Sequence, residues 1–125
     1  TLLDSPDLIT KKIKRAKTDA EVGLEFDNPN RPEANNLLTL YSILSGLGRE
    51  VVAKECATMG WGVFKPLLSE ATIAALTPIQ SRYNELMNNR DELNKILEIG
   101  RNQAEEVAEA TLKRVQNAMG LLSRS

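Results

Sequence analysis

Apolar residues recur every three or four positions along most of this chain, and that spacing constrains the fold more than any other feature. It marks one face of an α-helix, which has ~3.6 residues per turn. No stretch sustains the alternation of apolar and polar residues that a half-buried strand needs. The sequence therefore predicts an all-α fold, an antiparallel helical bundle of about five helices with a long last one. The predicted helices are residues 6–16, 32–45, 49–58, 63–87 and 91–119.

Capping and turn-forming residues separate these segments. Ser5 before Pro6 is typical of a helix start, and Gly46 and Gly120 are typical of helix ends. Residues 19–32 are rich in Asp, Asn and Pro, so we expect a polar connection there. Residues 32–45 are apolar on most sides, which predicts a buried helix.

The composition excludes several kinds of site. The 125 residues include no His, so imidazole catalysis and His-ligated metal sites are excluded, and we expect no metal. The single Cys, Cys56, rules out an internal disulfide and is expected to fill a small space in the core. Five aromatic residues are too few for a broad base-stacking platform. With no apolar run of ~18 residues, we expect no membrane contact and a cytoplasmic protein.

The densest charge lies in the first predicted helix. Because the net charge is -1, only a local patch can attract a polyanion. Residues 11–17 supply such a patch, with Lys11, Lys14 and Arg15 on one side of the helix and Lys12 pointing elsewhere. Two interpretations stay open: a solvated face near the helix C-terminus, which the dipole favours, or a phosphate-contacting surface.

Arg82, after Pro78 in the fourth predicted helix, also has two interpretations: an ordinary position on an amphipathic helix, or an exposed arginine that hydrogen-bonds a phosphate or a base edge.

Three stretches of this chain resemble the C-terminal third of bacterial tryptophanyl-tRNA synthetases. Their order and spacing carry the resemblance, which runs nearly end to end. The first comprises Leu3-Asp4-Ser5-Pro6, Ile9, Lys11-Lys12-Ile13, Ala16 and Thr18-Asp19; the second, Arg31-Pro32-Glu33, Asn36-Leu37-Leu38, Leu40-Tyr41 and Gly46; the third, Gly60-Trp61-Gly62, Phe64-Lys65, Pro78-Ile79, Arg82-Tyr83, Ala108, Thr111-Leu112, Val115 and Ala118-Met119-Gly120-Leu121.

The resemblance implies a C-terminal fragment that starts just after the KMSKS loop of its parent enzyme. Residues 1–19 would be a connector helix following that loop, and residues 20–125 the helical anticodon-binding domain. The parent would be an ATP- and magnesium-dependent tryptophan–tRNA ligase and a homodimer. Its partners would be tryptophan tRNA and its own catalytic domain. Neither the HIGH nor the KMSKS motif occurs in this sequence, so the resemblance implies no catalytic or cofactor-binding residue here.

The same resemblance adds candidate tRNA contacts to the basic cluster. The implied set is Lys11, Lys12, Lys14, Arg15, Lys65, Arg82 and Arg101. Two other functions remain open: a helical protein-interaction module without RNA binding, and a small complete enzyme. The enzyme is disfavoured because the sequence offers no nucleophile paired with a base.

Overall fold

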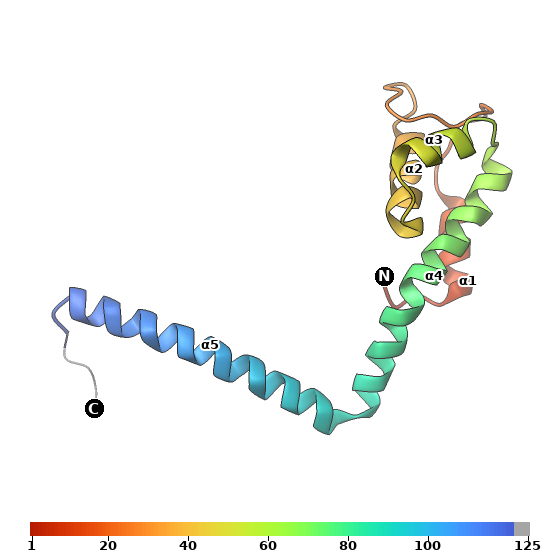
Figure 1. Ribbon diagram of the computed structural model, residues 1–125. Coiled ribbons are helices and arrows are strands. Elements are labelled where there is room, and N and C mark those ends of the chain that lie inside the picture. Colours follow the sequence, from red (N-terminus) through yellow and green to blue (C-terminus); the bar gives the residue numbers. More distant parts are fainter. Residues whose placement is uncertain (122–125) are drawn as a thin grey trace. The chain divides into compact units, whose positions relative to one another are not determined.

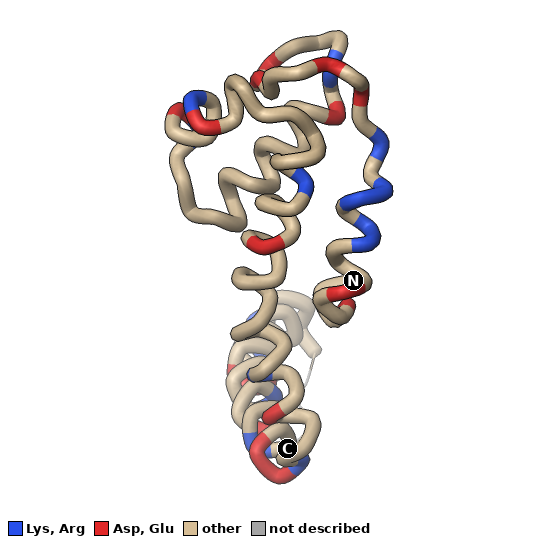
Figure 2. The backbone as a smooth tube through the Cα atoms, turned by 90° about the vertical axis from the view of Figure 1, so that its right-hand side faces the viewer, with Lys and Arg blue, Asp and Glu red and all other residues tan. Residues whose placement is uncertain are grey.

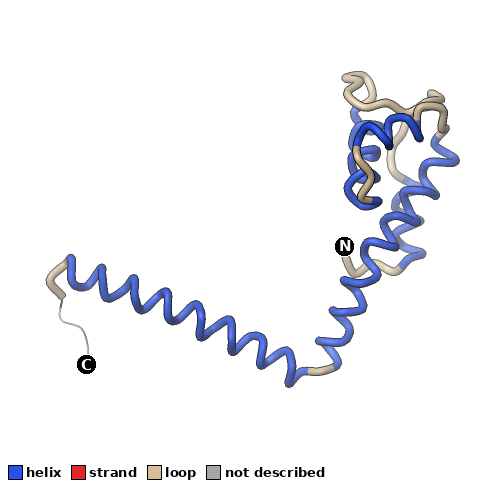
Figure 3. The backbone as a smooth tube through the Cα atoms, in the orientation of Figure 1, coloured by secondary structure: helices blue, strands red, loops and turns tan. Residues whose placement is uncertain are grey.

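The computed structural model describes residues 1–121 and confirms the all-α prediction (Figure 1). Its five helices are α1 (Pro6–Arg15), α2 (Pro32–Ser45), α3 (Arg49–Cys56), α4 (Trp61–Asn88) and α5 (Arg90–Ala118). Loops connect them, and residues 1–121 contain no strand (Figure 3). Among residues 1–121, none of the helices combines the length and the hydropathy of a membrane-spanning segment.

The caps of the helices follow from local chemistry. The Ser5 side chain accepts a hydrogen bond from the backbone N–H of Leu8 and so caps α1, as predicted. Gly46 (φ 72°) and Gly120 (φ 68°) follow the ends of α2 and α5 in the left-handed region, which glycine adopts without steric cost. Asn89 caps α5 by accepting from the N–H of Glu92.

Residues 1–82 form one compact unit, and a second unit begins at Tyr83. The core of the first unit lies where α2, α3 and the start of α4 meet. Phe64 is fully buried, and the Tyr41 ring meets it edge-on at 5.7 Å between centroids. Cys56 is also fully buried, which confirms its predicted role as a small core residue. The other fully or nearly fully buried residues of this core are Leu24, Leu38, Val52 and Leu68.

One prediction about burial is wrong. The predicted buried helix, α2, buries Ala34, Leu37, Leu38 and Tyr41, but Leu40 and Ile43 are exposed because only one side of the helix meets the core. Conversely, Leu24 is 1% exposed although it lies in the polar connection.

The connection before α2 is folded back onto the end of α3. The N–H groups of Gly23 and Leu24 donate to the carbonyls of Met59 and Cys56, at 3.0 and 3.2 Å. These bonds satisfy carbonyls that the end of a helix leaves unpaired. Gly23 is required there, because its φ is 86° and a Cβ would lie 2.8 Å from the carbonyl oxygen of Ala57.

Helix α1 runs antiparallel to α4 within the first unit (Figure 1). At one end, the Gln80 side chain donates to the carbonyls of Leu2 (2.8 Å) and Asp4 (3.0 Å). At the other, Lys65 Nζ donates to the carbonyls of Lys14 (3.1 Å) and Ala16 (2.8 Å). Because α1 buries a single side chain, Ile9, these polar contacts set its position.

Helix α5 has no buried side chain in the described part of the chain. Its apolar residues, among them Leu97, Val107 and Met119, are exposed. Acidic residues occupy its first turn, where the helix dipole favours negative charge.

Candidate nucleic-acid interface

The predicted cationic surface exists on α1. Figure 2 shows a run of basic positions in the segment that follows the N-terminus, with further basic positions elsewhere in the chain. Lys11, Lys14 and Arg15 are exposed, and the residues that the structure describes provide no ion pair or hydrogen bond for their charged groups. These three side chains therefore form a strip of available positive charge, which we call the α1 strip.

Lys12 lies outside the α1 strip, as the helix spacing predicts. Its Nζ is 2.6 Å from Asp4 Oδ2, and the N-terminal ammonium lies 2.8 Å from the same oxygen. The bond from Lys12 and the terminal ammonium hold the pKa of the Asp4 carboxyl well below its usual range, and Asp4 in turn raises the pKa of Lys12. Lys12 is thus engaged with the start of its own helix.

Lys65 is also engaged with the protein itself. Its ammonium reaches the last carbonyls of α1, where the helix dipole is negative and the carbonyls lack helical partners. Lys65 therefore joins α4 to α1, and its charge reinforces the cationic side of α1.

The two remaining candidates lie further along the chain. Arg82 is exposed on α4 at the end of the first compact unit. Arg101 belongs to the second unit, where it lies 3.6 Å from Glu98 and donates to the side chain of Asn102. Arg101 is therefore the one candidate in the second unit. The other candidates lie in the first unit: Lys11, Lys12, Lys14, Arg15, Lys65 and Arg82.

The sequence did not predict a polar cluster around Arg31, which is only 5% exposed. Its Nε and one terminal nitrogen donate to both oxygens of Asp19 at 2.8 and 2.9 Å, and the other donates to the Gly23 carbonyl at 2.7 Å. Trp61 Nε1 adds a bond of 3.1 Å to Asp19. The bonds from Arg31 and Trp61 hold the pKa of Asp19 well below its usual range. We call these residues the Arg31 cluster.

The Arg31 cluster brings together residues from all three resembling stretches of sequence. Asp19 comes from the first stretch, Arg31 from the second and Trp61 from the third, and they meet in one hydrogen-bonded group. Lys17 and Glu33 add an exposed ion pair of 2.9 Å between the first two stretches. The sequence feature that could have predicted this cluster is the pair of opposite charges, Asp19 and Arg31, at the two ends of the turn-rich connection.

A hollow of about 380 Å³ lies between α1 and the first turns of α4, beside the α1 strip. Trp61 forms part of its wall, and Lys14 stands at its α1 side. Its lining residues are Thr10, Lys14, Trp61, Gly62, Lys65, Pro66 and Ser69, which include two ammonium groups and no carboxylate.

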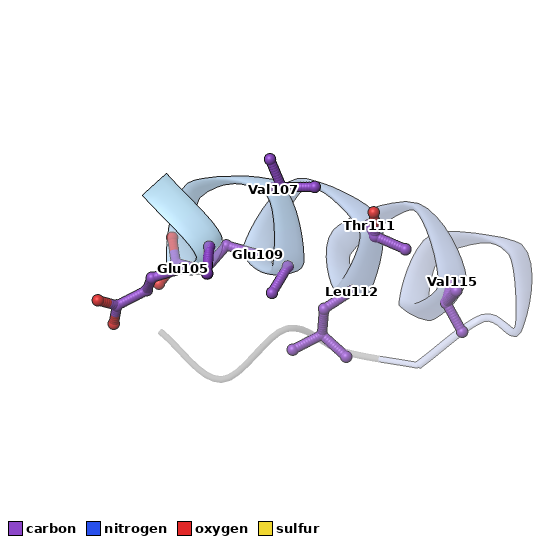
Figure 4. A pocket seen from close by; sticks show the side chains of 8 residues that line it. Glu105, Val107, Glu109, Thr111, Leu112 and Val115 are labelled. Atoms are coloured by element: carbon purple, nitrogen blue, oxygen red, sulfur yellow. The ribbon is translucent and has the colours of Figure 1, made fainter. Parts of the chain in front are cut away.

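A hollow along α5 is less suited to a polyanion. It is lined by apolar Val107, Leu112 and Val115 together with Glu105 and Glu109, whose charges repel phosphate (Figure 4).

The buried Cys56 is not a candidate catalytic residue. Burial raises the pKa of its thiol to about 11, so this residue is not a nucleophile at neutral pH.

Comparison with known proteins identifies the family. The profile of the family described as "tRNA synthetases class I (W and Y)" matches residues 1–77. The chain belongs to this family. The tryptophan–tRNA ligase of Prochlorococcus marinus (strain MIT 9313) is 63% identical over the whole chain, which spans 37% of that relative. The chloroplastic/mitochondrial tryptophan–tRNA ligase of Arabidopsis thaliana is 53% identical over 98% of the chain, which spans 30% of that relative.

A solved structure supports the fold of this class I synthetase chain. Tryptophanyl-tRNA synthetase from Campylobacter jejuni, complexed with ADP and tryptophan, aligns with a TM-score of 0.68. The alignment covers 96% of this chain and 38% of the other, at 22% identity. The family and the resemblance predicted from the three stretches are thus confirmed, and this chain corresponds to about a third of its relatives' length.

Proposed function

We propose that this chain is the tRNA-binding helical part of an ATP-dependent tryptophan–tRNA ligase. One observation carries the proposal: a chain of net charge -1 holds three exposed cations side by side on α1, and no residue among 1–121 pairs with them. Single-sign local charge without counter-charges attracts a polyanion even when the whole chain is neutral. The relatives named as tryptophan–tRNA ligases support the choice of tryptophan tRNA as the polyanion.

The proposal assigns different parts to the candidate residues. Lys11, Lys14 and Arg15 contact phosphates, while Lys12 and Lys65 mainly hold α1 in place. Arg82 and Arg101 are proposed as further contacts. Residues 1–19 form the connector, and residues 20–125 the anticodon-binding domain.

The whole protein would load tryptophan onto its tRNA using ATP and magnesium. We propose that it is cytoplasmic and acts as a homodimer with its catalytic domain. The HIGH and KMSKS motifs are absent from these 125 residues, so we expect this chain alone to be inactive.

A binding titration tests the proposal. The chain is titrated with tryptophan tRNA and with the same tRNA carrying a swapped anticodon, at several salt concentrations. The triple variant Lys11→Gln, Lys14→Gln, Arg15→Gln should lower the salt slope of log K by about 2 to 3, because each lost phosphate contact removes ~0.7 to 0.9. Lys54→Gln, which removes an exposed cation on α3, is the control and should change the slope little.

The outcomes separate the candidate functions. Weaker binding of the anticodon-swapped tRNA supports anticodon reading by residues 20–125, and equal binding leaves phosphate contacts alone. If the chain binds no tRNA at any salt concentration, the proposal is wrong and a protein-interaction module is favoured.

A further inference from the structure

The hollow between α1 and α4 differs in charge from two other hollows found among residues 1–121. Lys14 and Lys65 line it, and no carboxylate does; because the Lys65 ammonium is bonded to α1 carbonyls, Lys14 supplies the positive charge that a ligand can reach. By contrast, Glu105 and Glu109 line the hollow on α5, and Glu21 and Glu25 line one beside Arg31. The α1–α4 hollow is therefore suited to an anionic ligand.

Trp61 gives this hollow a wall that is already fixed in orientation. Its indole N–H is committed to Asp19 at 3.1 Å, and its ring meets Phe64 edge-on at 6.0 Å between centroids. Because the N–H is committed, the partly exposed indole offers the hollow only its ring surface. A fixed aromatic ring binds flat, unsaturated groups by stacking at little cost in conformational entropy.

The hollow is continuous with the α1 strip. Thr10 and Lys14 are four residues apart and lie on the side of α1 that faces the hollow. Lys11 and Arg15, also four apart, lie about 100° further round the helix axis. A backbone of phosphates can therefore follow Lys11 and Arg15 while a group attached to it enters the hollow past Lys14.

We propose that this hollow receives one unpaired base of a bound RNA, which stacks on Trp61 while its phosphate lies against Lys14. The inference rests on the proposed tRNA binding and names the part of the RNA that enters the protein. The base must be unpaired, because a base inside a duplex cannot leave the stack without breaking its pair. A single base fits a chain with one Trp in its hollow and few aromatic residues elsewhere.

The chain offers a direct probe, because Trp61 is its only tryptophan. Its fluorescence is recorded during titration of the full chain with tryptophan tRNA and with a fully paired RNA duplex of similar length. We expect the tRNA to quench the emission and to protect Trp61 from acrylamide. The duplex should do neither, even at concentrations at which it binds.

Variants that fill the hollow or remove its charge sharpen the test. Gly62 lines the hollow, and a Cβ at this position meets no atom within 4 Å. Gly62→Leu therefore adds bulk at the wall, and because leucine favours helices the variant should fold. We expect it to weaken tRNA binding about tenfold, the size of one lost base stack. Lys14→Gln should lower the salt slope by about 1.

The matched control is Ala74→Leu, which places the same leucine side chain at an exposed position of α4 that does not line the hollow. It should bind tRNA as the wild type does. If tRNA binds but leaves Trp61 emission unchanged, or Gly62→Leu binds normally, the hollow holds no base and the proposed function stands. Equal quenching by the duplex also overturns the inference. If no RNA binds, both proposals fail.

Discussion

Arg31 and Arg15 are both arginines of the first compact unit, yet the fold uses them in opposite ways. Arg31 is 5% exposed and gives its donors to Asp19 and to the Gly23 carbonyl. Arg15 is exposed, and no residue among the described ones pairs with it. The Arg31 cluster stabilises the fold, and the α1 strip leaves its charge available to a ligand.

The difference shows that a cation within a recognisable motif need not be part of the binding surface. Asp19, Arg31 and Trp61 belong to the resembling stretches, and in this structure they hold the connection, α2 and α4 together. A buried donor without an acceptor destabilises the fold, so it must be hydrogen-bonded within the protein. An exposed cation is solvated by water, so leaving it unpaired costs little stability.

The largest effect that separates the two regions is expected from Arg31→Gln. Glutamine cannot replace the bidentate pair with Asp19 or reach the Gly23 carbonyl, so partly buried acceptors lose their donors. We expect the free energy of unfolding to fall by about 2 to 3 kcal/mol. Urea denaturation followed by circular dichroism measures the change.

Arg15→Gln is the matched control on the exposed helix, and we expect its stability to change by less than about 0.5 kcal/mol. The comparison breaks down if the two variants lose stability equally, since Arg31 would then contribute no more than a surface charge.

The second-largest expected effect is the dependence of stability on pH, which distinguishes the Arg31 cluster from the α1 strip. The folded pKa of Asp19 lies below its unfolded value, so folded Asp19 binds fewer protons and its stabilisation is present above about pH 4. That stabilisation is lost as the pH falls through the folded pKa. Asp19→Asn should therefore be less stable than the wild type at pH 7, and the gap should narrow below about pH 4.

Urea denaturation from pH 7 to pH 2 follows this gap. Asp4→Asn is the comparison, because Lys12 and the N-terminal ammonium lower the pKa of Asp4 in the same direction, so its gap to the wild type should also narrow at low pH. A gap that stays constant with pH would mean that the charge of Asp19 does not stabilise the fold.

The smallest effect concerns α1 itself. The resemblance implies that its apolar residues pack on the catalytic domain, which these 125 residues lack, so we predict from the sequence that residues 6–16 fray. The contacts from Lys65 and Gln80 at its two ends instead favour an ordered helix. We expect amide-exchange protection across Ile9–Ile13 in the wild type and a loss of about tenfold in Lys65→Met.

Lys54→Met on α3 is the control for this measurement, since its ammonium has no bond within residues 1–121. Free exchange of the α1 amides in the wild type would show that the two contacts do not order the helix.

Much of the fold could be predicted because helix formation depends on nearby residues. The range of α2 was predicted in full, and the other helix ends lie within two residues of the predicted ones. Burial was harder, since Leu24 is buried only because residues 23 and 24 bond to the end of α3. Ile43 is exposed because no described element covers that side of α2.

The candidate site was predicted in part. Spacing on a helix placed Lys11, Lys14 and Arg15 on one side and Lys12 on another, as the structure has them. The sequence could not show that Lys65 bonds to α1 carbonyls, because the two residues it reaches are about fifty positions away. For the same reason the hollow beside Trp61 was not predicted.

The sequence by itself determined the helices, their caps, the family and the cationic side of α1, since each depends on residues within a few positions or on a pattern along the chain. The tertiary structure alone decided which charged groups are bonded within the protein and which stay available to a ligand. Asp19, Arg31 and Trp61 come together only when α4 packs against the connection, and Lys65 meets α1 only when the two helices lie antiparallel. Whether a charge is available to RNA depends on distance in space and on burial, and neither is written in local sequence.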